Sequence, residues 1–197
     1  KKNSSIVLTV NSVATGSSDA LVAAGSTGAA MASSLFGLGR IPGVDRPAIA
    51  VTLPTMKKPM VLIDSGANTD STPNMLYQFG LMGSTYAKSI LGIKEPRVAL
   101  LNIGEEEGKG DELAKDTYKV FSENKDKINF IGNAEGKEIF LGNSDVIVCD
   151  GFVGNVTLKT IEGVAKMFFY MVKKEFTADI WTKIMGLLVK PILKKMY

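Results

Sequence analysis

Short runs that are almost entirely apolar, each closed by glycine or a short polar residue, constrain the fold of this chain more than any other feature. Met60–Asp64 and Asp145–Cys149 show the pattern most clearly, because neither alternates apolar with polar residues. Strands that are buried on both faces of a parallel sheet have this character. We predict strands at Asp19–Ala24, Pro47–Leu53, Met60–Asp64, Arg97–Ile103, Ile128–Ile131 and Asp145–Cys149.

Longer segments with helical spacing separate these runs. Pro73 suits the first turn of one helix, and Asp111 can cap another that starts at Glu112. The predicted helices are Thr27–Leu38, Pro73–Leu91, Glu112–Asn124, Val153–Phe176 and Ile180–Met196. This alternation predicts an α/β fold, a three-layer αβα sandwich with a mostly parallel sheet. We place the core at residues 1–176 and an amphipathic helical tip, part of the same domain, at residues 177–197.

Composition excludes several kinds of chemistry. The chain has 197 residues, one cysteine and no histidine, so an intrachain disulfide and a Ser-His-Asp arrangement are both excluded. A single cysteine fits a reducing cytoplasm. The first ten residues are too weakly apolar for a secretory signal, and no run has the ~18 apolar residues of a membrane span.

Glycine-rich turns follow the predicted strands and precede the predicted helices. In parallel sheets, ligands bind at the carboxyl ends of the strands, where the backbone amides of the helix starts favour anions. The alternative is that the glycines only form turns and helix caps. As a set, the turns favour a pocket for a small, oxygen-rich anion. They are Gly25–Gly28, Asp64–Asn68, Gly104–Gly110, Gly132–Gly136 and Asp150–Asn155.

Lys109 is the only lysine in these turns, and we predict that it neutralises phosphate; the alternative is a solvated lysine at a helix start. Asp150 could orient a donor, and Asn155 could donate to a ligand oxygen. Asp64 and Asp150 could instead cap helices, as could Ser26 and Thr27. The predicted catalytic residues are Lys109, Asp150 and Asn155. The predicted phosphate or substrate contacts are Gly25, Ser26, Thr27, Gly28, Asp64, Asn68, Gly108, Gly110, Asn133 and Gly154.

Cys149 ends an apolar strand beside an aspartate, an environment that disfavours the thiolate. We interpret it as buried and inert rather than as an acyl carrier. Neither a dinucleotide fingerprint nor a Walker loop is present, and we expect no cofactor and no metal site. Inorganic phosphate is partly dianionic near neutral pH and could attack without a side-chain base.

The last 42 residues carry a net charge of +5, although the whole chain carries +3. Apolar residues at helical spacing alternate there with lysines, and Pro191 kinks or splits the helix. We predict contact with an anionic membrane surface through Leu187, Leu188, Val189 and Lys190. The alternative is a helix packed on a dimer partner. Nucleic acid is not expected, because no recognition motif is present.

Read together, these segments resemble the bacterial phosphate acyltransferase family, PlsX. The resemblance runs from about Asp19 to the end of the chain. It is carried by Ala24–Ala29, Gly39–Pro47, Asp64–Asn68, Gln78–Ser84, Leu100–Gly110, Asn129–Gly136 and Cys149–Asn155.

The resemblance implies transfer of a long acyl chain from acyl carrier protein to inorganic phosphate, which makes acyl phosphate for phospholipid synthesis. It also implies a homodimer, an isocitrate-dehydrogenase-like fold and peripheral membrane association. The family's opening strand and glycine loop, and its glycine-rich C-terminal region, have no counterpart here, so we expect an internal fragment. Two alternatives are an NAD-dependent dehydrogenase on a related fold and a non-catalytic scaffold at the membrane surface.

Overall fold

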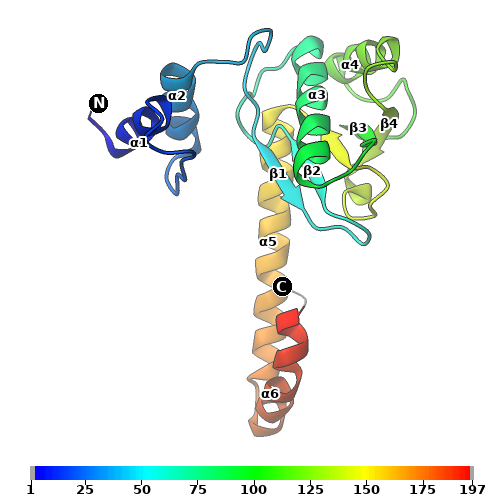
Figure 1. Ribbon diagram of the computed structural model, residues 1–197. Helices are drawn as coiled ribbons and strands as arrows, with labels where there is room; N and C mark the ends of the chain where they lie inside the picture. Colours follow the sequence, from blue (N-terminus) through cyan, green and yellow to red (C-terminus); the bar gives the residue numbers. More distant parts are fainter. Residues whose placement is uncertain (1–2, 196–197) are drawn as a thin grey trace. The chain divides into compact units, whose positions relative to one another are not determined.

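The computed structural model describes the backbone of residues 3–195 and the side chains of residues 3–191 (Figure 1). The chain divides into two compact units between Asn155 and Val156. The first unit contains α1 (Ser5–Ala14), α2 (Thr27–Leu38), α3 (Pro73–Ile90) and α4 (Glu112–Glu123). It also contains the sheet and the start of α5 (Gly151–Phe176), which continues into the second unit with α6 (Ile180–Lys195).

One five-stranded sheet forms the centre of the first unit, in the order β1-β2-β5-β3-β4. Its strands are β1 (Ala50–Leu53), β2 (Met60–Ile63), β3 (Val98–Asn102), β4 (Phe130–Glu135) and β5 (Val146–Val148). β1 pairs antiparallel with β2, and the other three pairings are parallel. The predicted α/β class and mostly parallel sheet are therefore confirmed.

α3 and α4 pack on one face of the sheet and bury its core there (Figure 1). Phe79 of α3 and Phe121 of α4 are fully buried in this cluster, and the Phe121 ring stacks on Phe130 at 4.7 Å. Because strand side chains alternate, Leu62 and Ile147 belong to the opposite face, and they are buried as well. Burial on both faces explains why these strands are continuously apolar.

Local signals in the sequence mark where two helices start. α3 begins at Pro73, with the Thr72 hydroxyl accepting the Met75 N–H at 3.3 Å. α4 begins at Glu112, and the Asp111 carboxylate accepts the Ala114 N–H at 2.8 Å. Both predicted start signals are confirmed, and the other predicted helices agree with α2, α5 and α6 to within a few residues.

Two strand predictions need correction. Asp19–Ala24 is not a strand: it has no partner strand in the described part of the chain, and its Val22 side chain is 94% exposed. β4 does not stop at Ile131 but continues to Glu135, so most of the predicted Gly132–Gly136 turn is strand. The register shifts between Val98, which pairs with Phe130, and Ala99, which pairs with Gly132, so the shift skips Ile131; Gly132 has φ of +106°.

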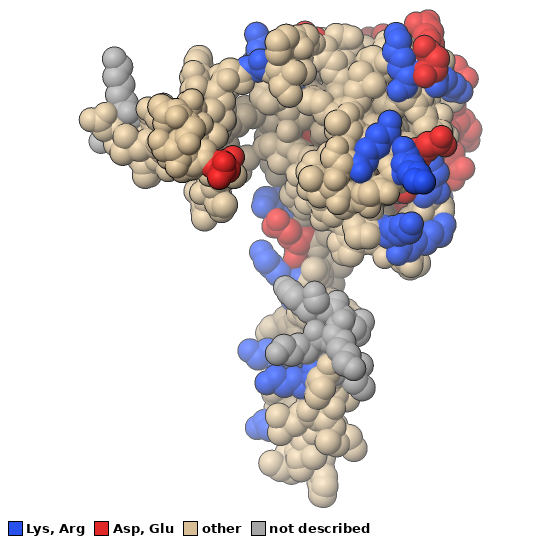
Figure 2. All heavy atoms as spheres, viewed as in Figure 1, with Lys and Arg blue, Asp and Glu red and all other residues tan. Residues whose placement is uncertain are grey.

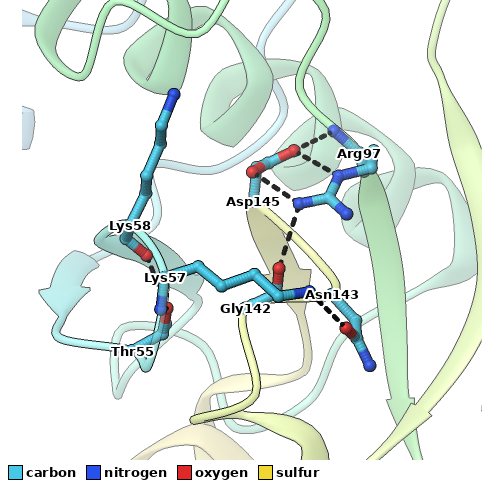
Figure 3. A network of polar contacts seen from close by, with 7 residues as sticks. All are labelled: Thr55, Lys57, Lys58, Arg97, Gly142, Asn143 and Asp145. Carbon is cyan, nitrogen blue, oxygen red and sulfur yellow. Dashed lines mark hydrogen bonds and ion pairs between the residues drawn. The ribbon is translucent and has the colours of Figure 1, made fainter.

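The amino ends of β3 and β5 are joined by an ion pair (Figure 3). Arg97 donates from Nε and Nη2 to the Asp145 carboxylate at 2.9 and 3.0 Å, and also to the Gly142 carbonyl. Burial raises the pKa of Asp145, but the hydrogen bonds from Arg97 outweigh this effect and hold that pKa below its ordinary value. The pair fixes the starts of the two strands, at the edge of the sheet opposite the loops that follow β2 and β5.

The second unit consists of α6 and most of α5. α6 continues through Pro191 without a break, so the predicted split of this helix does not occur. Leu187 and Leu188 of α6 are 68% and 67% exposed, whereas Val189 is half-buried. No helix in the described residues is long and apolar enough to cross a membrane.

Candidate active site

The carboxyl ends of the four parallel strands meet at one edge of the sheet. Ile63, Val148, Leu100 and Asn133 stand in register across β2, β5, β3 and β4. β2 and β5 end at this row, whereas β3 and β4 run two residues further. The loops Asp64–Asn68 and Cys149–Asp150 therefore leave from neighbouring strands, beside the loop that follows β3. This is the edge at which open parallel sheets bind ligands.

The Asp64 carboxylate organises the loop after β2. It is fully buried, and its Oδ1 accepts the N–H groups of Ile49, Gly66 and Ala67 at 2.9–3.1 Å. Its Oδ2 accepts the backbone N–H and the side-chain Nδ2 of Asn68 at 2.8 and 2.9 Å. Five donors satisfy this buried charge. Asp64 therefore shapes the loop and neither caps a helix nor offers an uncommitted oxygen.

Asn68 joins this loop to the start of α5. Its carbonyl accepts the Gly151 N–H at 2.7 Å, and its Nδ2 also donates to the Pro47 carbonyl at 2.8 Å. A side chain at Gly151 would meet the Asn68 backbone at 2.6 Å, and one at Gly154 would overlap the Asp64 carbonyl. These two glycines are required because backbone approaches backbone here.

Asp150 caps α5. Its Oδ1 accepts the N–H groups of Phe152 and Val153 at 2.8 and 3.0 Å, which confirms capping as one of its two predicted roles. Asn155 is exposed one turn later and lies against Gly66, and no hydrogen bond of its side-chain amide is found within the described residues. The structure thus brings together Asp64, Asn68, Asp150, Gly154 and Asn155, which we call the β2/β5 cluster.

Cys149 lies beneath this cluster. It is buried, and its thiol donates to the Asp64 carbonyl at 3.4 Å. Burial raises the pKa of this thiol, and the neighbouring Asp150 and Asp64 carboxylates raise it further. The prediction that this cysteine is buried is confirmed, and the thiol stays protonated at neutral pH.

A second group forms at the ends of β3 and β4. The Glu106 carbonyl accepts the Lys109 N–H at 3.1 Å and the Asn133 Nδ2 at 2.9 Å, so the predicted residues Lys109 and Asn133 share one partner. Asn102 also donates to the Lys109 carbonyl, at 3.1 Å. Sequence analysis missed Asn102, although its position between an apolar strand and Gly104 was a signal.

In this loop Gly110 packs closely against Asn102, whereas the Lys109 side chain is exposed. Gly110 has φ of +89°, and a side chain there would meet the Asn102 amide at 2.6 Å. The Lys109 side chain is exposed, with its Cγ and Cδ beside Gly104, and it makes no ion pair with the other residues that the structure describes. Gly108 is exposed and has open space around it. The ammonium group is therefore available to an anion.

The remaining predicted segment, Gly25–Gly28, precedes and begins α2. The Ser26 hydroxyl accepts the Ala29 N–H at 3.4 Å, which is the predicted capping role, and Thr27 is the first residue of the helix. Among the described residues, no hydrogen bond joins this segment to the strand-end loops. Ligand contacts by Gly25, Ser26, Thr27 and Gly28 remain a prediction. Within the same described part of the chain, no group of acidic residues and cysteine has the arrangement of a metal site.

Residues 1–197 match the family model described as fatty acid synthesis protein. A phosphate acyltransferase from Halothermothrix orenii is 52% identical over 195 residues, covering 99% of this chain and 58% of that protein. One from Desulfitobacterium hafniense is 54% identical over 196 residues, with coverage of 99% and 58%. The chain thus spans a little over half the length of these curated relatives.

Solved structures support the fold. A phosphotransacetylase from Streptococcus pyogenes superposes with a TM-score of 0.63 at 18% identity, covering 81% of this chain and 55% of that one. The EutD phosphotransacetylase from Staphylococcus aureus gives 0.61 at 19% identity, with coverage of 82% and 56%. At such identities the likeness concerns the fold alone.

Proposed function

The chain belongs to the fatty acid synthesis protein family, and from this premise we propose that it transfers an acyl group to inorganic phosphate. The observation that carries the proposal is identity of 52% and 54%, over almost the whole chain, to proteins named phosphate acyltransferase. We further propose that the donor is a long-chain acyl thioester of acyl carrier protein. The acyl phosphate formed would serve phospholipid synthesis.

The reaction needs positioning and charge stabilisation rather than a side-chain nucleophile. An oxygen of the phosphate dianion attacks the thioester carbonyl carbon, and a tetrahedral intermediate forms with negative charge on the former carbonyl oxygen. When this intermediate collapses, the carbon–sulfur bond breaks, the acyl–oxygen–phosphorus linkage remains, and the phosphate proton passes to the departing thiolate. Donors aimed at the developing charge supply most of the acceleration in such a step.

The described geometry supports a division of roles. Lys109, whose ammonium is available, is proposed to neutralise phosphate, with amide contacts from Gly108 and Gly110. Asn155, whose side-chain amide is also available, is proposed to donate to a substrate oxygen. Asp150 holds the start of α5 in place, and Asn68 and Gly154 let it approach the β2 loop. Asn133 supports the Lys109 loop through the Glu106 carbonyl.

No acyl-enzyme intermediate is part of this proposal. The Cys149 thiol is buried and its raised pKa keeps it protonated, so it is a poor nucleophile. Phosphate attack on the thioester also requires no cofactor. Because the phosphate dianion needs no side-chain base, a chain without histidine is consistent with this reaction.

The helical tip at residues 177–197 is proposed to bind the anionic, cytoplasmic surface of a membrane. The core at residues 1–176 is proposed to form a homodimer. Lysine side chains of the second unit gather along one side of the helices in view (Figure 2). Leu187 and Leu188 are exposed apolar residues that can enter a bilayer interface, and the exposed Lys190 and half-buried Val189 are proposed to contribute beside them.

The decisive assay follows release of carrier thiol from a long-chain acyl carrier protein thioester by the purified protein, with and without phosphate. Thiol release that requires phosphate supports acyl transfer. Release at the same rate without phosphate would indicate a thioesterase. A dehydrogenase would instead show NAD-dependent absorbance changes, which no finding on this chain favours.

A further inference from the structure

The β2/β5 cluster lacks a cation of its own. The loops Asp64–Asn68 and Cys149–Asn155 contain two carboxylates and neither lysine nor arginine. The amides of Phe152 and Val153, which could otherwise bind an anion at the start of α5, are taken by Asp150. A phosphate placed here would therefore meet negative charge and helix-start amides that are already occupied, with the Asn155 side-chain amide as a neutral donor. If this cluster binds a phosphate oxyanion, a neighbouring segment must supply the positive charge.

The segment Pro47–Ile49 is docked against this cluster. The Pro47 carbonyl accepts Asn68 Nδ2 at 2.8 Å, and the Ile49 N–H donates to Asp64 Oδ1 at 3.0 Å. The Ile49 carbonyl accepts both the N–H and the hydroxyl of Ser65, at 2.9 and 3.0 Å. Arg46 immediately precedes this segment, so its backbone lies beside the β2 loop.

The other flank of Arg46 is also fixed. The Asp45 N–H donates to Gln78 Oε1 at 2.8 Å, and Asp45 Oδ2 accepts Asn74 Nδ2 and Gln78 Nε2 at 2.9 and 3.1 Å. Asp45 is the acidic residue nearest to Arg46 in the sequence. Its Oδ2 already accepts hydrogen bonds from the side-chain amides of Asn74 and Gln78 in α3. Arg46 itself is exposed, and within the described part of the chain its guanidinium makes no hydrogen bond or ion pair.

The other two arginines are committed elsewhere. Arg97 pairs with Asp145 at the opposite edge of the sheet. Arg40 donates to the Asp45 carbonyl within the same turn. The backbone on both sides of Arg46 is therefore held by hydrogen bonds, and its guanidinium has no partner among the described residues. Arg46 adjoins the acidic β2/β5 cluster at the carboxyl ends of the strands.

We propose that Arg46 binds a phosphate oxyanion of a substrate at the β2/β5 cluster. The planar guanidinium can donate two parallel hydrogen bonds to phosphate oxygens, and its charge offsets the Asp64 and Asp150 carboxylates. The inference rests on the proposed acyl transfer, which offers two sources of this chemistry. One is inorganic phosphate, and the other is the phosphodiester of the carrier protein's prosthetic arm.

The test compares Arg46→Ala and Arg46→Lys with two controls in the purified protein. Lys58→Ala removes one charge at the opposite edge, and Arg40→Ala removes a hydrogen bond from the Asp45 turn. Calorimetric titration with inorganic phosphate measures affinity independently of turnover. Steady-state assays give KM for phosphate and for the acyl carrier thioester, and thermal unfolding reports on the fold.

Arg46→Ala should weaken one of these phosphate interactions by about 10- to 100-fold, and Arg46→Lys by less, while both controls stay near wild type. A rise in KM for phosphate identifies the nucleophile as the ligand, whereas a rise in KM for the thioester identifies the prosthetic arm. Unchanged phosphate affinity with both KM values unchanged would overturn the proposal. An equal loss in Arg40→Ala with a lowered Tm would also overturn it, since the turn alone would then be responsible.

Failure of acyl transfer is distinguishable from failure of the Arg46 site. A wild-type protein that forms no acyl phosphate, yet binds phosphate in an Arg46-dependent way, contradicts the proposed function and leaves this site standing. If the wild-type protein forms acyl phosphate and Arg46→Ala changes neither turnover nor phosphate binding, the proposed function stands and the Arg46 site is contradicted.

Discussion

Gly154→Ala should destabilise the protein strongly, although alanine is the better helix former. An added methyl would overlap the Asp64 carbonyl oxygen and stand 2.9 Å from the Cys149 sulfur. Neither neighbour can retreat easily, because the Asp64 N–H bonds the Cys149 carbonyl at 3.0 Å and the Cys149 N–H bonds the Ile63 carbonyl at 2.8 Å. The start of α5 must therefore move away from the β2 loop.

Overpacking of this kind costs about 1–3 kcal/mol or more. Loss of the hydrogen bond from Gly151 to Asn68 adds about 1 kcal/mol, and better helix propensity returns at most about 1 kcal/mol. The expected net loss of about 1–3 kcal/mol lowers Tm by roughly 2–12 °C for a chain of this size.

Thermal unfolding followed by far-UV circular dichroism measures this loss, with Gly163→Ala as the matched control in the same helix. A side chain at Gly163 meets no atom within 4 Å, so that variant should gain about 0.5–1 kcal/mol from helix propensity. Equal Tm values for Gly154→Ala and wild type would refute the reasoning, as would a comparable loss in the control.

Four further outcomes are expected. Lys109→Ala should lose about 10²–10³-fold in rate, and full activity in the thiol-release assay would remove it from the mechanism. Cys149→Ala should keep most of its turnover, whereas an acyl group found on wild-type Cys149 by mass spectrometry would establish a covalent route. Replacing Leu187 and Leu188 by Glu should release the protein from anionic liposomes in flotation assays; unchanged flotation with a dimer falling to monomer would mark a subunit contact instead. The lowered pKa of Asp145 contributes stability above about pH 4 that is lost on further acidification, so Asp145→Asn should flatten the decline in Tm below that pH.

Local chemistry in the sequence was enough to predict most helices. A proline in the first turn, or an aspartate just before it, acts through neighbours within three or four residues, as at Pro73 and Asp111. The continuously apolar runs likewise predicted the parallel strands β2, β3 and β5, because burial on both faces leaves a direct compositional trace.

Strand existence and extent were less predictable, since a strand depends on a partner. The Asp19–Ala24 run is mostly apolar, but no described strand pairs with it, and it forms no regular secondary structure. Gly132 looks like a turn residue in the sequence. It instead lies inside β4, where it pairs with Ala99 just after the register shift, and pairing with β3 continues to Glu135. The helix Ser5–Ala14 was not predicted.

The membership of the candidate site was predicted better than the roles of its residues. A lone aspartate after a strand could cap, bind or orient, and only the folded loop shows that Asp64 is satisfied by five N–H donors. The approach of Asn68 to Gly151 joins residues far apart in the chain. Such contacts leave no periodic signal in the sequence. For the same reason, the contacts of Pro47–Ile49 with the loop after β2 could not be predicted.

Acyl transfer to phosphate is tested most directly by the origin of the oxygen atoms in the product. The purified protein is incubated with a long-chain acyl carrier thioester and phosphate labelled with ¹⁸O at all four positions, and the product is analysed by mass spectrometry and ³¹P NMR. Direct attack predicts an acyl phosphate that retains all four labelled oxygens, including the bridging one. Unlabelled fatty acid as the only product, or an acyl group left on the protein, would contradict it.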